Sequence, residues 1–342
     1  MTNFSDSFFA KSRKNVVGCD KILYLCAQET VRVNMEIACC TDRGYLKYCV
    51  TMWLSLFDHH QGEEVGIHLL TNGLEPEEIE KARRIVEAHG ARFAAYDVDG
   101  ALLDALPKGQ YGYITSTTYA RLFLPVILPE QVERVIYLDC DLLVTDSLLP
   151  LWNYPLGDGH EVAAVEDSCS ANAGYYSRLY LSAEKHRYFN AGVLLVNLEA
   201  WRRNGFVERA RNLLCGGELQ LDYADQDVLN VLCCGRTTYL PFRYNLQEAM
   251  LRRYVPEMSD EARLKIVESL SSPAVIHFTY ILKPWTYESF HPYRSLFYHY
   301  FDQTEWAGER PIPTLKQRLW RIMWRIGAML GRVNTYHPLP KT

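Results

Sequence analysis

The chain has 342 residues, 48% of them hydrophobic and 23% charged, which is the composition of a globular protein long enough for one large domain with a small appendage. Its 36 basic and 41 acidic side chains give a formal net charge of -5, which excludes a global positive field that would draw the protein to nucleic acid or membrane. The ten cysteines form no C-x-x-C pair, so they favour reduced thiols in a cytoplasm over a zinc site or a disulfide framework.

The first 33 residues lack the apolar core and small-residue cleavage site of a secretory signal peptide. We therefore treat residues 1–33 as an extension and expect the fold to begin at about residue 34. No apolar run reaches the roughly 18 residues that a membrane-spanning helix needs. These features predict a protein that is soluble or lies on a membrane surface.

Short apolar runs bounded by turn residues predict six buried strands, at residues 35–40, 65–70, 135–138, 162–165, 192–196 and 274–276. Between the second and third runs, residues 74–90 carry Pro76 near a helix start, an apolar stripe and Gly90 as a stop. Strands alternating with helices predict a mostly parallel α/β sheet, whose ligands bind beyond the carboxyl ends of the strands. We expect residues 34–312 to form one domain and residues 313–342 a basic tail.

An acidic pair follows the third expected strand. Asp139 and Asp141, separated by one cysteine, project from the strand's carboxyl end. Two neighbouring carboxylates repel one another, and a divalent cation relieves that repulsion while bridging to phosphate oxygens. The alternative for this pair is a solvated turn or a helix cap.

A histidine and a lysine follow the last expected strand. His277 closes the run PAVIH and could stand at the same edge of the sheet, and Lys283 lies near enough along the chain to bind a phosphate as a point charge. The alternative for His277 is a structural histidine. Two aspartates and one histidine suit Mn²⁺ or Mg²⁺ better than zinc, because carboxylates dominate the set.

Seven ordered segments carry a resemblance to a known family: CCTDRGY, TTYARLFLP, VIYLDCDLLV, PLWN, YFNAGVLLVNLEAWRR, YADQDVLN and HFTYILKPW. They resemble the bacterial branch of glycosyltransferase family 8, the retaining hexosyltransferases that include the galactosyl- and glucosyltransferases of lipopolysaccharide and lipooligosaccharide. The resemblance implies a GT-A fold, which is a Rossmann-like, mostly parallel sheet flanked by helices. It also implies a UDP-sugar donor and a metal cofactor, Mn²⁺ or Mg²⁺.

The resemblance assigns donor-binding roles residue by residue. Asp42 and Tyr45 match residues at the uracil, where the tyrosine ring stacks on the base. Thr118 and Arg121 match residues at the donor, with Arg121 near the sugar and the diphosphate, and Lys283 matches a diphosphate-binding lysine. The alternative for Arg121 is an ion pair on a helix surface.

The resemblance also assigns the metal ligands, Asp139, Asp141 and His277, and four polar groups around the transferred sugar: Asp167, Asn190, Asp225 and Gln226. For Asn190 the alternative is a turn residue before a strand, and for Asp225 it is a helix N-cap. Gln226 matches the position beneath the anomeric carbon, and an amide is a poor nucleophile. We therefore favour same-face attack over a covalent intermediate, for which Asp225 is the nearest plausible carboxylate.

The sequence departs from the family pattern at three positions. Tyr280 replaces a glycine after the metal histidine, Gly44 replaces an asparagine-like residue beside the base, and Tyr113 stands where a histidine occurs. Two other functions compete with transfer. One is a haloacid-dehalogenase-type phosphatase, although Leu143 stands where that motif has Thr or Val, and the other is an inactive sugar-binding relative.

The tail predicts membrane association. From Leu315 to Val333 a helical projection places arginines on one side, apolar residues on the other and two tryptophans near the boundary, as in a helix that lies in a membrane surface. The alternative is a helix packed on the domain. The expected partners are UDP-galactose or UDP-glucose, a glycolipid or oligosaccharide acceptor such as a lipopolysaccharide core, and anionic membrane, without nucleic acid. The expected location is the inner face of the cytoplasmic membrane.

Overall fold

The computed structural model describes residues 35–98, 116–217, 219–255 and 258–339. The expected extension, residues 1–33, lies outside the described residues, and so does Tyr113. Residues 34–342 form one compact unit by their contacts. All further statements concern the described part of that unit.

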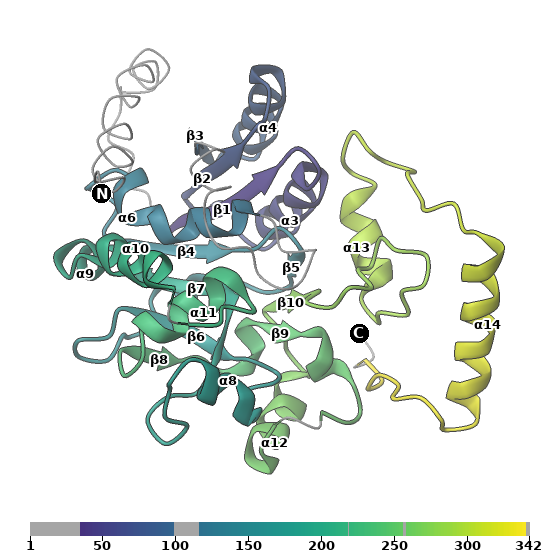
Figure 1. Ribbon diagram of the computed structural model, residues 1–342. Coiled ribbons are helices and arrows are strands. Elements are labelled where there is room, and N and C mark those ends of the chain that lie inside the picture. The colour runs from purple at the N-terminus through teal and green to yellow at the C-terminus, as the bar shows by residue number, and fades with distance from the viewer. Residues whose placement is uncertain (1–34, 99–115, 218, 256–257, 340–342) are drawn as a thin grey trace. The chain divides into compact units, whose positions relative to one another are not determined.

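The central sheet has seven strands in the order β3 (Arg92–Asp97), β2 (Val65–Asn72), β1 (Met35–Asp42), β4 (Arg134–Leu138), β7 (Phe189–Asn197), β6 (Val162–Glu166) and β8 (Thr237–Tyr239) (Figure 1). Four of the neighbouring pairs are parallel, while β7 runs antiparallel to both β4 and β6. The expectation of a mostly parallel α/β sheet is confirmed. Strands β2, β6 and β7 are buried along nearly their whole length, which explains why they read as continuous apolar runs.

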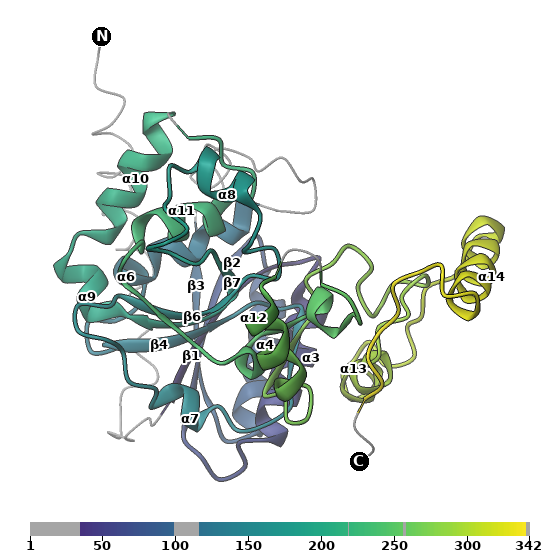
Figure 2. The same cartoon turned by 90° about the horizontal axis from the view of Figure 1, so that it is seen from below.

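Helices cover both faces of this sheet. Figure 2 shows α10 (Phe206–Gly216) and α11 (Ala224–Leu232) on one side and α3 (Leu46–Asp58) and α4 (Pro76–Ala88) on the other. Helix α4 is the one expected at residues 74–90: Pro76 opens it, Glu75 and Glu78 form a reciprocal capping box, and Gly90 follows it in the left-handed conformation with φ of 77°. The two layers of helices bury the apolar strands on both faces.

Most of the remaining helical elements lie between strands, and α13 (Arg294–Phe301) and α14 (Leu315–Met329) follow the last strand. Those between strands are η2 (Ser116–Phe123), α6 (Leu124–Ile127), α7 (Leu149–Trp152), α8 (Ala173–Arg178), α9 (Leu198–Arg203), η3 (Phe242–Tyr244), η4 (Glu248–Leu251) and α12 (Asp260–Ser269).

A second, three-stranded sheet stands beside the first, in the order β5 (Leu142–Val144), β10 (Val275–His277) and β9 (Leu246–Gln247). Strand β10 is the run expected at 274–276. The placement of His277 at the edge of the central sheet is corrected here, because β10 pairs antiparallel with β5 and places His277 opposite Leu142. Since Leu142 directly follows Asp141, this small sheet brings His277 to the acidic pair.

The chain beyond α13 leaves the body and returns to it. Helix α14 follows, and the residues after α14 pair with the loop after η4, with a β-bridge between Arg252 and Tyr336. The Tyr336 hydroxyl donates to Oε1 of Glu248 at 2.6 Å, and Arg252 donates to the same oxygen at 2.7 Å. Within the described residues, no helix has the length and apolar character required to span a bilayer.

Candidate active site

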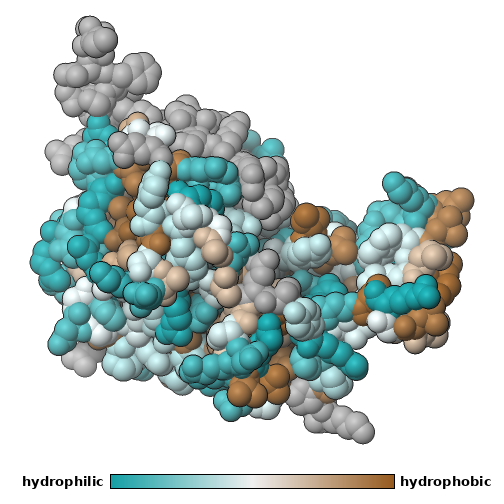
Figure 3. Space-filling view, turned by 60° about the horizontal axis from the view of Figure 1, so that its bottom comes forward, coloured by the Kyte–Doolittle hydropathy of each residue, from teal (hydrophilic) through white to brown (hydrophobic). Residues whose placement is uncertain are grey.

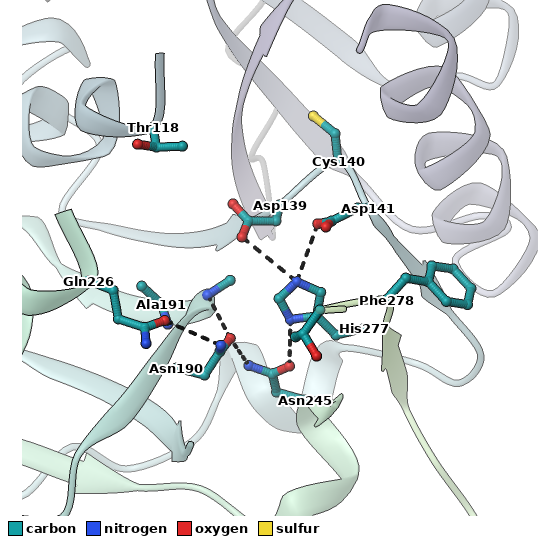
Figure 4. Close-up of polar contacts among 12 residues, drawn as sticks. Thr118, Asp139, Cys140, Asp141, Asn190, Ala191, Gln226, Asn245, His277 and Phe278 are labelled. Atoms are coloured by element: carbon teal, nitrogen blue, oxygen red, sulfur yellow. Dashed lines mark hydrogen bonds and ion pairs between the residues drawn. The ribbon is translucent and has the colours of Figure 1, made fainter. Parts of the chain in front are cut away.

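All twelve side chains expected at the site line one cavity of about 530 Å³. Its walls come from the ends of β1, β4 and β7, from η2, from the start of α11, and from the segments that follow β9 and β10. The cavity lies beyond the carboxyl ends of β1 and β4, where we expected a ligand to bind. Figure 4 shows how the side chains at its centre point toward one another.

The acidic pair and the histidine converge at the floor of this cavity. Nε2 of His277 lies 3.2 Å from Oδ1 of Asp141 and 3.8 Å from Oδ2 of Asp139 (Figure 4). Each of the three residues offers one ligand atom, and these atoms all lie within 4.8 Å of one another. His277 is buried, and the two carboxylates are partly exposed. Two carboxylate oxygens and one imidazole nitrogen at this spacing fit a hard divalent cation.

A glycine makes room for this cluster. A Cβ atom on Gly192 would lie 2.1 Å from Cε1 of His277 and 2.8 Å from Oδ2 of Asp139. The carbonyl oxygen of Gly192 also accepts a hydrogen bond from the backbone N–H of Asp139 at 2.8 Å. The glycine therefore lets β7 approach the ligand side chains closely.

Lys283 is fixed beside the same ligands. Its ammonium group donates to Oδ2 of Asp141 at 2.6 Å and to the carbonyl oxygen of Phe278. Burial by itself would raise the pKa of Asp141, but Lys283 and His277 outweigh it and hold that pKa well below its usual range. Asp141 is thus a carboxylate at neutral pH.

Arg121 is buried between the acidic pair and α11, with 4% of its surface exposed. Its Nη2 atom lies 2.9 Å from Oδ1 of Asp139 and its Nε atom lies 2.8 Å from Oδ2 of Asp225. Burial would lower the pKa of the guanidinium, but these two carboxylates outweigh it and raise that pKa. Arg121 is therefore a permanent positive charge inside the cavity and not an ion pair on a helix surface.

Asp225 is not a helix N-cap, and Asn190 is not a turn residue. Helix α11 begins at Ala224 with Tyr223 as its N-cap, so Asp225 lies in the first turn and is buried against Arg121. Burial raises the pKa of Asp225 to about 6, although the charge of Arg121 opposes that shift. Asn190 lies inside strand β7 and not in a turn before it.

The sugar-side residues form one hydrogen-bonded group. The amide nitrogen of Asn190 donates to Oδ2 of Asp167 and to Oε1 of Gln226, at 3.2 Å each. Gln226 Oε1 also accepts from the backbone N–H of Ala191 at 3.0 Å. Burial raises the pKa of Asp167, and hydrogen bonds from the Cys169 N–H and from the neighbouring amides oppose that rise.

The expected uracil side lies at the end of β1. Oδ1 of Asp42 accepts a hydrogen bond from the backbone N–H of Tyr45 at 3.0 Å, which places the tyrosine at the start of α3. The Tyr45 ring packs edge-on against Trp285 with centroids 6.2 Å apart. Tyr280, the residue in place of a glycine, lines the cavity with 52% of its surface exposed.

Three residues in the cavity wall or directly behind it were not expected from the sequence: Tyr137, Glu248 and Asn245. Tyr137 donates to Oδ1 of Asp139 at 3.0 Å, and Glu248 lines the cavity while Tyr336 and Arg252 hold its carboxylate. Asn245 contacts both His277 and Asn190. The contacts of Asn245 and of Glu248 with Tyr336 join segments far apart in the chain, which a single sequence does not display. Tyr137 instead lies two residues before Asp139, where nothing in the apolar run distinguishes it from a buried strand residue.

Comparison with known proteins defines the class. The model of glycosyl transferase family 8 matches residues 36–289, which is most of the chain, and the protein belongs to this family. The arrangement of its sheet and helices is the GT-A fold, which it shares with galactosyltransferase LgtC, solved in complex with donor and acceptor sugar analogs. That structure is 26% identical with a TM-score of 0.71, and the match covers 84% of this chain and all of LgtC.

Two further relatives show the range of the family. General stress protein A of Bacillus subtilis is 29% identical over 80% of this chain and 94% of its own length. Lipopolysaccharide 1,2-glucosyltransferase of Escherichia coli K12 is 24% identical over 81% of this chain and 80% of its own. A second solved structure, of an LgtC active-site mutant in which glutamate replaces a glutamine, is 26% identical with a TM-score of 0.70, and the match covers 84% of this chain and all of LgtC.

Proposed function

We propose that the protein transfers galactose or glucose from a UDP-sugar to a glycolipid or lipopolysaccharide-core acceptor, with retention of anomeric configuration and with a divalent metal, Mn²⁺ or Mg²⁺. The observation that carries this proposal is the single cavity in which an Asp-Asp-His cluster, a buried arginine and a sugar-side amide group meet. Relatives that transfer glucose to lipopolysaccharide support the substrate class.

Asp139, Asp141 and His277 would hold the metal. When bound there, a divalent cation would neutralise charge on the diphosphate of the donor. Arg121 and Lys283 add two fixed positive charges on either side of the acidic pair. Preorganised positive charge stabilises the negative charge that develops on the leaving diphosphate more than it stabilises the intact donor.

In the proposed reaction, the bond between the anomeric carbon and the diphosphate oxygen breaks, and the acceptor hydroxyl oxygen forms a bond to the same face of that carbon. The acceptor's proton passes to the leaving diphosphate. Gln226 supports the positive charge that develops on the sugar with an amide oxygen, which Asn190 and the Ala191 N–H hold in place. LgtC has an active-site glutamine as well, which favours this role.

The competing covalent route would use Asp225. Oδ2 of Asp225 is paired with Arg121 at 2.8 Å, and that pairing withdraws electron density from a would-be nucleophile. The same-face route is favoured for this reason. The family membership also favours transfer over a haloacid-dehalogenase-type phosphatase.

Membrane association is the second part of the proposal, and α14 carries it. No residue of α14 is buried. Its inner side rests on the loop before α13, where Trp324 stacks on Phe290 with centroids 4.1 Å apart and Arg321 donates to the Tyr287 carbonyl at 2.7 Å. Its outer side exposes between 40% and 79% of six apolar side chains: Leu315, Leu319, Ile322, Met323, Ile326 and Met329.

Figure 3 shows these hydrophobic residues along the outer side of the helix, at the right of the view. Exposed basic side chains flank the apolar strip: Lys316, Arg318 and Arg325. An apolar strip between positive charges fits the surface of an anionic bilayer, where each basic residue contributes about 1 kcal/mol. We propose that α14 places the cavity near a lipid-linked acceptor at the inner face of the cytoplasmic membrane.

The proposed donor chemistry is tested by incubating the protein with UDP-glucose or UDP-galactose and Mn²⁺, without acceptor, and measuring released UDP. One of the two sugars should be hydrolysed, and EDTA should abolish the release. A protein that releases nothing from any nucleotide sugar, yet hydrolyses phosphate monoesters, would contradict the proposal and favour the phosphatase.

A further inference from the structure

Asn245 joins the metal-ligand cluster to the sugar side of the cavity. It stands between η3 and β9, and none of its surface is exposed. Its Oδ1 atom lies 2.9 Å from Nδ1 of His277, and its Nδ2 atom donates to Oδ1 of Asn190 at 2.9 Å (Figure 4). Asn190 then reaches Gln226 at 3.2 Å.

The backbone N–H of Gly192 fixes which atom donates in each hydrogen bond of this series. The N–H of Gly192 donates to Oδ1 of Asn190 at 3.0 Å, and a backbone N–H is always a donor, so that atom of Asn190 is an acceptor. Asn245 must therefore turn its amide nitrogen to Asn190 and its oxygen to His277. It follows that Nδ1 of His277 carries the hydrogen.

The tautomer of His277 has a direct consequence for the cluster. In the neutral ring, whose one hydrogen is then on Nδ1, the lone pair of Nε2 is directed toward the two carboxylates that would share a cation with it, 3.2 Å from Asp141 and 3.8 Å from Asp139. This is the form in which an imidazole binds a cation. Residues that accept the second ring hydrogen of a metal-binding histidine typically change metal affinity 10- to 100-fold when they are replaced.

We propose that Asn245 is a positioning residue that acts on both halves of the site: its oxygen sets the tautomer and orientation of His277 for the metal, and its nitrogen orients Asn190 beside Gln226 for the sugar. This inference rests on the proposed function. The oxygen and the nitrogen of this amide make separate bonds, one to His277 and one to Asn190. A substitution that removes only the bond to Asn190 should therefore affect donor binding and leave metal binding intact.

Two substitutions separate the halves. Asn245→Leu removes both bonds at nearly the same volume, so the affinity for Mn²⁺ alone, measured by electron paramagnetic resonance without donor, should fall about 10- to 100-fold. Asn245→Asp keeps an acceptor for Nδ1 of His277 but loses the donor to Asn190. Above pH 7, this variant should keep Mn²⁺ affinity within about threefold of wild type while the KM for the UDP-sugar rises at least tenfold.

The matched control is another buried asparagine that bonds a buried histidine. Oδ1 of Asn230 lies 2.9 Å from Nε2 of His186, and both residues are almost wholly buried. The Asn230 side chain also bonds the Phe189 backbone and the Gln226 carbonyl, so Asn230→Leu should lower the unfolding temperature at least as much as Asn245→Leu but leave Mn²⁺ affinity unchanged.

The outcomes distinguish this inference from the proposed function. If the wild-type protein binds Mn²⁺ and Asn245→Leu binds it equally well, Asn245 is merely structural. If Asn230→Leu weakens Mn²⁺ binding as strongly as Asn245→Leu does, the loss reflects general destabilisation and the inference fails. A wild-type protein that binds no Mn²⁺ overturns the metal site itself.

Discussion

Arg121 pairs with Asp225 inside the cavity, with 2.8 Å between Nε and Oδ2, and both side chains are about 95% buried. Arg121 also contacts Asp139, so it links the acidic pair to the first turn of α11, which contains Asp225. Burial raises the pKa of Asp225 to about 6 even with the arginine beside it. Ionisation of the Asp225 carboxyl therefore destabilises the folded protein relative to the unfolded chain.

This pKa predicts a pH dependence of stability. Because the pKa of the folded state lies above the ordinary value of 3.8, the folded protein holds more protons than the unfolded chain between about pH 4 and pH 6, and stability falls as pH rises through that window. Asp225→Asn cannot ionise. We expect the unfolding free energy of wild type to fall relative to Asp225→Asn by at most about 3 kcal/mol from pH 4 to pH 7. A difference in urea denaturation that stays constant with pH would contradict this account.

Replacing Gln226 tests the route of transfer. Gln226→Ala should lower kcat about 100-fold without abolishing it, because the amide provides electrostatic support and forms no bond to the sugar. Gln303→Ala, at an exposed position that does not line the cavity, is the control and should leave kcat unchanged. Mass spectrometry of the intact variant with donor should detect no glycosyl adduct. An adduct trapped on Asp225 would instead establish the covalent route.

Gly192 is expected to admit no side chain. Gly192→Ala would place a Cβ atom 2.1 Å from the His277 ring, so the ring or strand β7 must shift, and Mn²⁺ affinity should fall at least tenfold. Gly216→Ala is the matched control, because a Cβ atom there meets nothing within 4 Å. Calorimetric titration with Mn²⁺ measures both. Equal affinity in Gly192→Ala and wild type would show that the cluster is not packed as described.

Much of this arrangement follows from the sequence, and the limits have physical causes. The six expected strands and helix α4 could be predicted because continuous apolar runs and capping residues are visible in a short stretch of sequence. The separate sheet that holds β10 could not, because strand pairing is a long-range choice. Three-residue strands such as β5 give no periodic pattern.

The site divides in the same way. Eleven of the twelve expected residues lie in the recognisable segments, Asp167 lies outside them, and all twelve line the cavity. Asn245 and Glu248 were not expected, since their importance lies in bonds to residues such as His277 and Tyr336 that are 32 and 88 positions away. The sequence also shows the two sides of α14, but only the structure shows that Arg321 and Trp324 face the body.

Substitutions on the outer side of α14 test membrane association. Leu319→Asn, Ile322→Asn and Ile326→Asn together should weaken binding to vesicles containing anionic lipid at least tenfold, because three apolar side chains no longer enter the bilayer. Cosedimentation measures the binding. The control is Leu264→Asn with Val267→Asn on α12, which are also exposed but have no such strip around them.

Substitution is preferable to truncation at this helix. Removing residues 314–342 would also remove Tyr336, which bonds Glu248 in the cavity wall, so activity and stability could fall for reasons unrelated to lipid. If the triple variant sediments with anionic vesicles as well as the wild type does, the membrane role of α14 is wrong.

The metal cluster is the centre of the account, and Asp139→Asn tests it most directly. The side chain of Asp139 is 24% exposed, so the neutral amide should leave the fold intact while one charged ligand is lost. We expect UDP release from the donor with saturating Mn²⁺ to fall at least 100-fold, with an unfolding temperature within a few degrees of wild type. Undiminished release by Asp139→Asn, or by the wild type in excess EDTA, would contradict the proposal that this protein transfers sugar through a metal held by Asp139, Asp141 and His277.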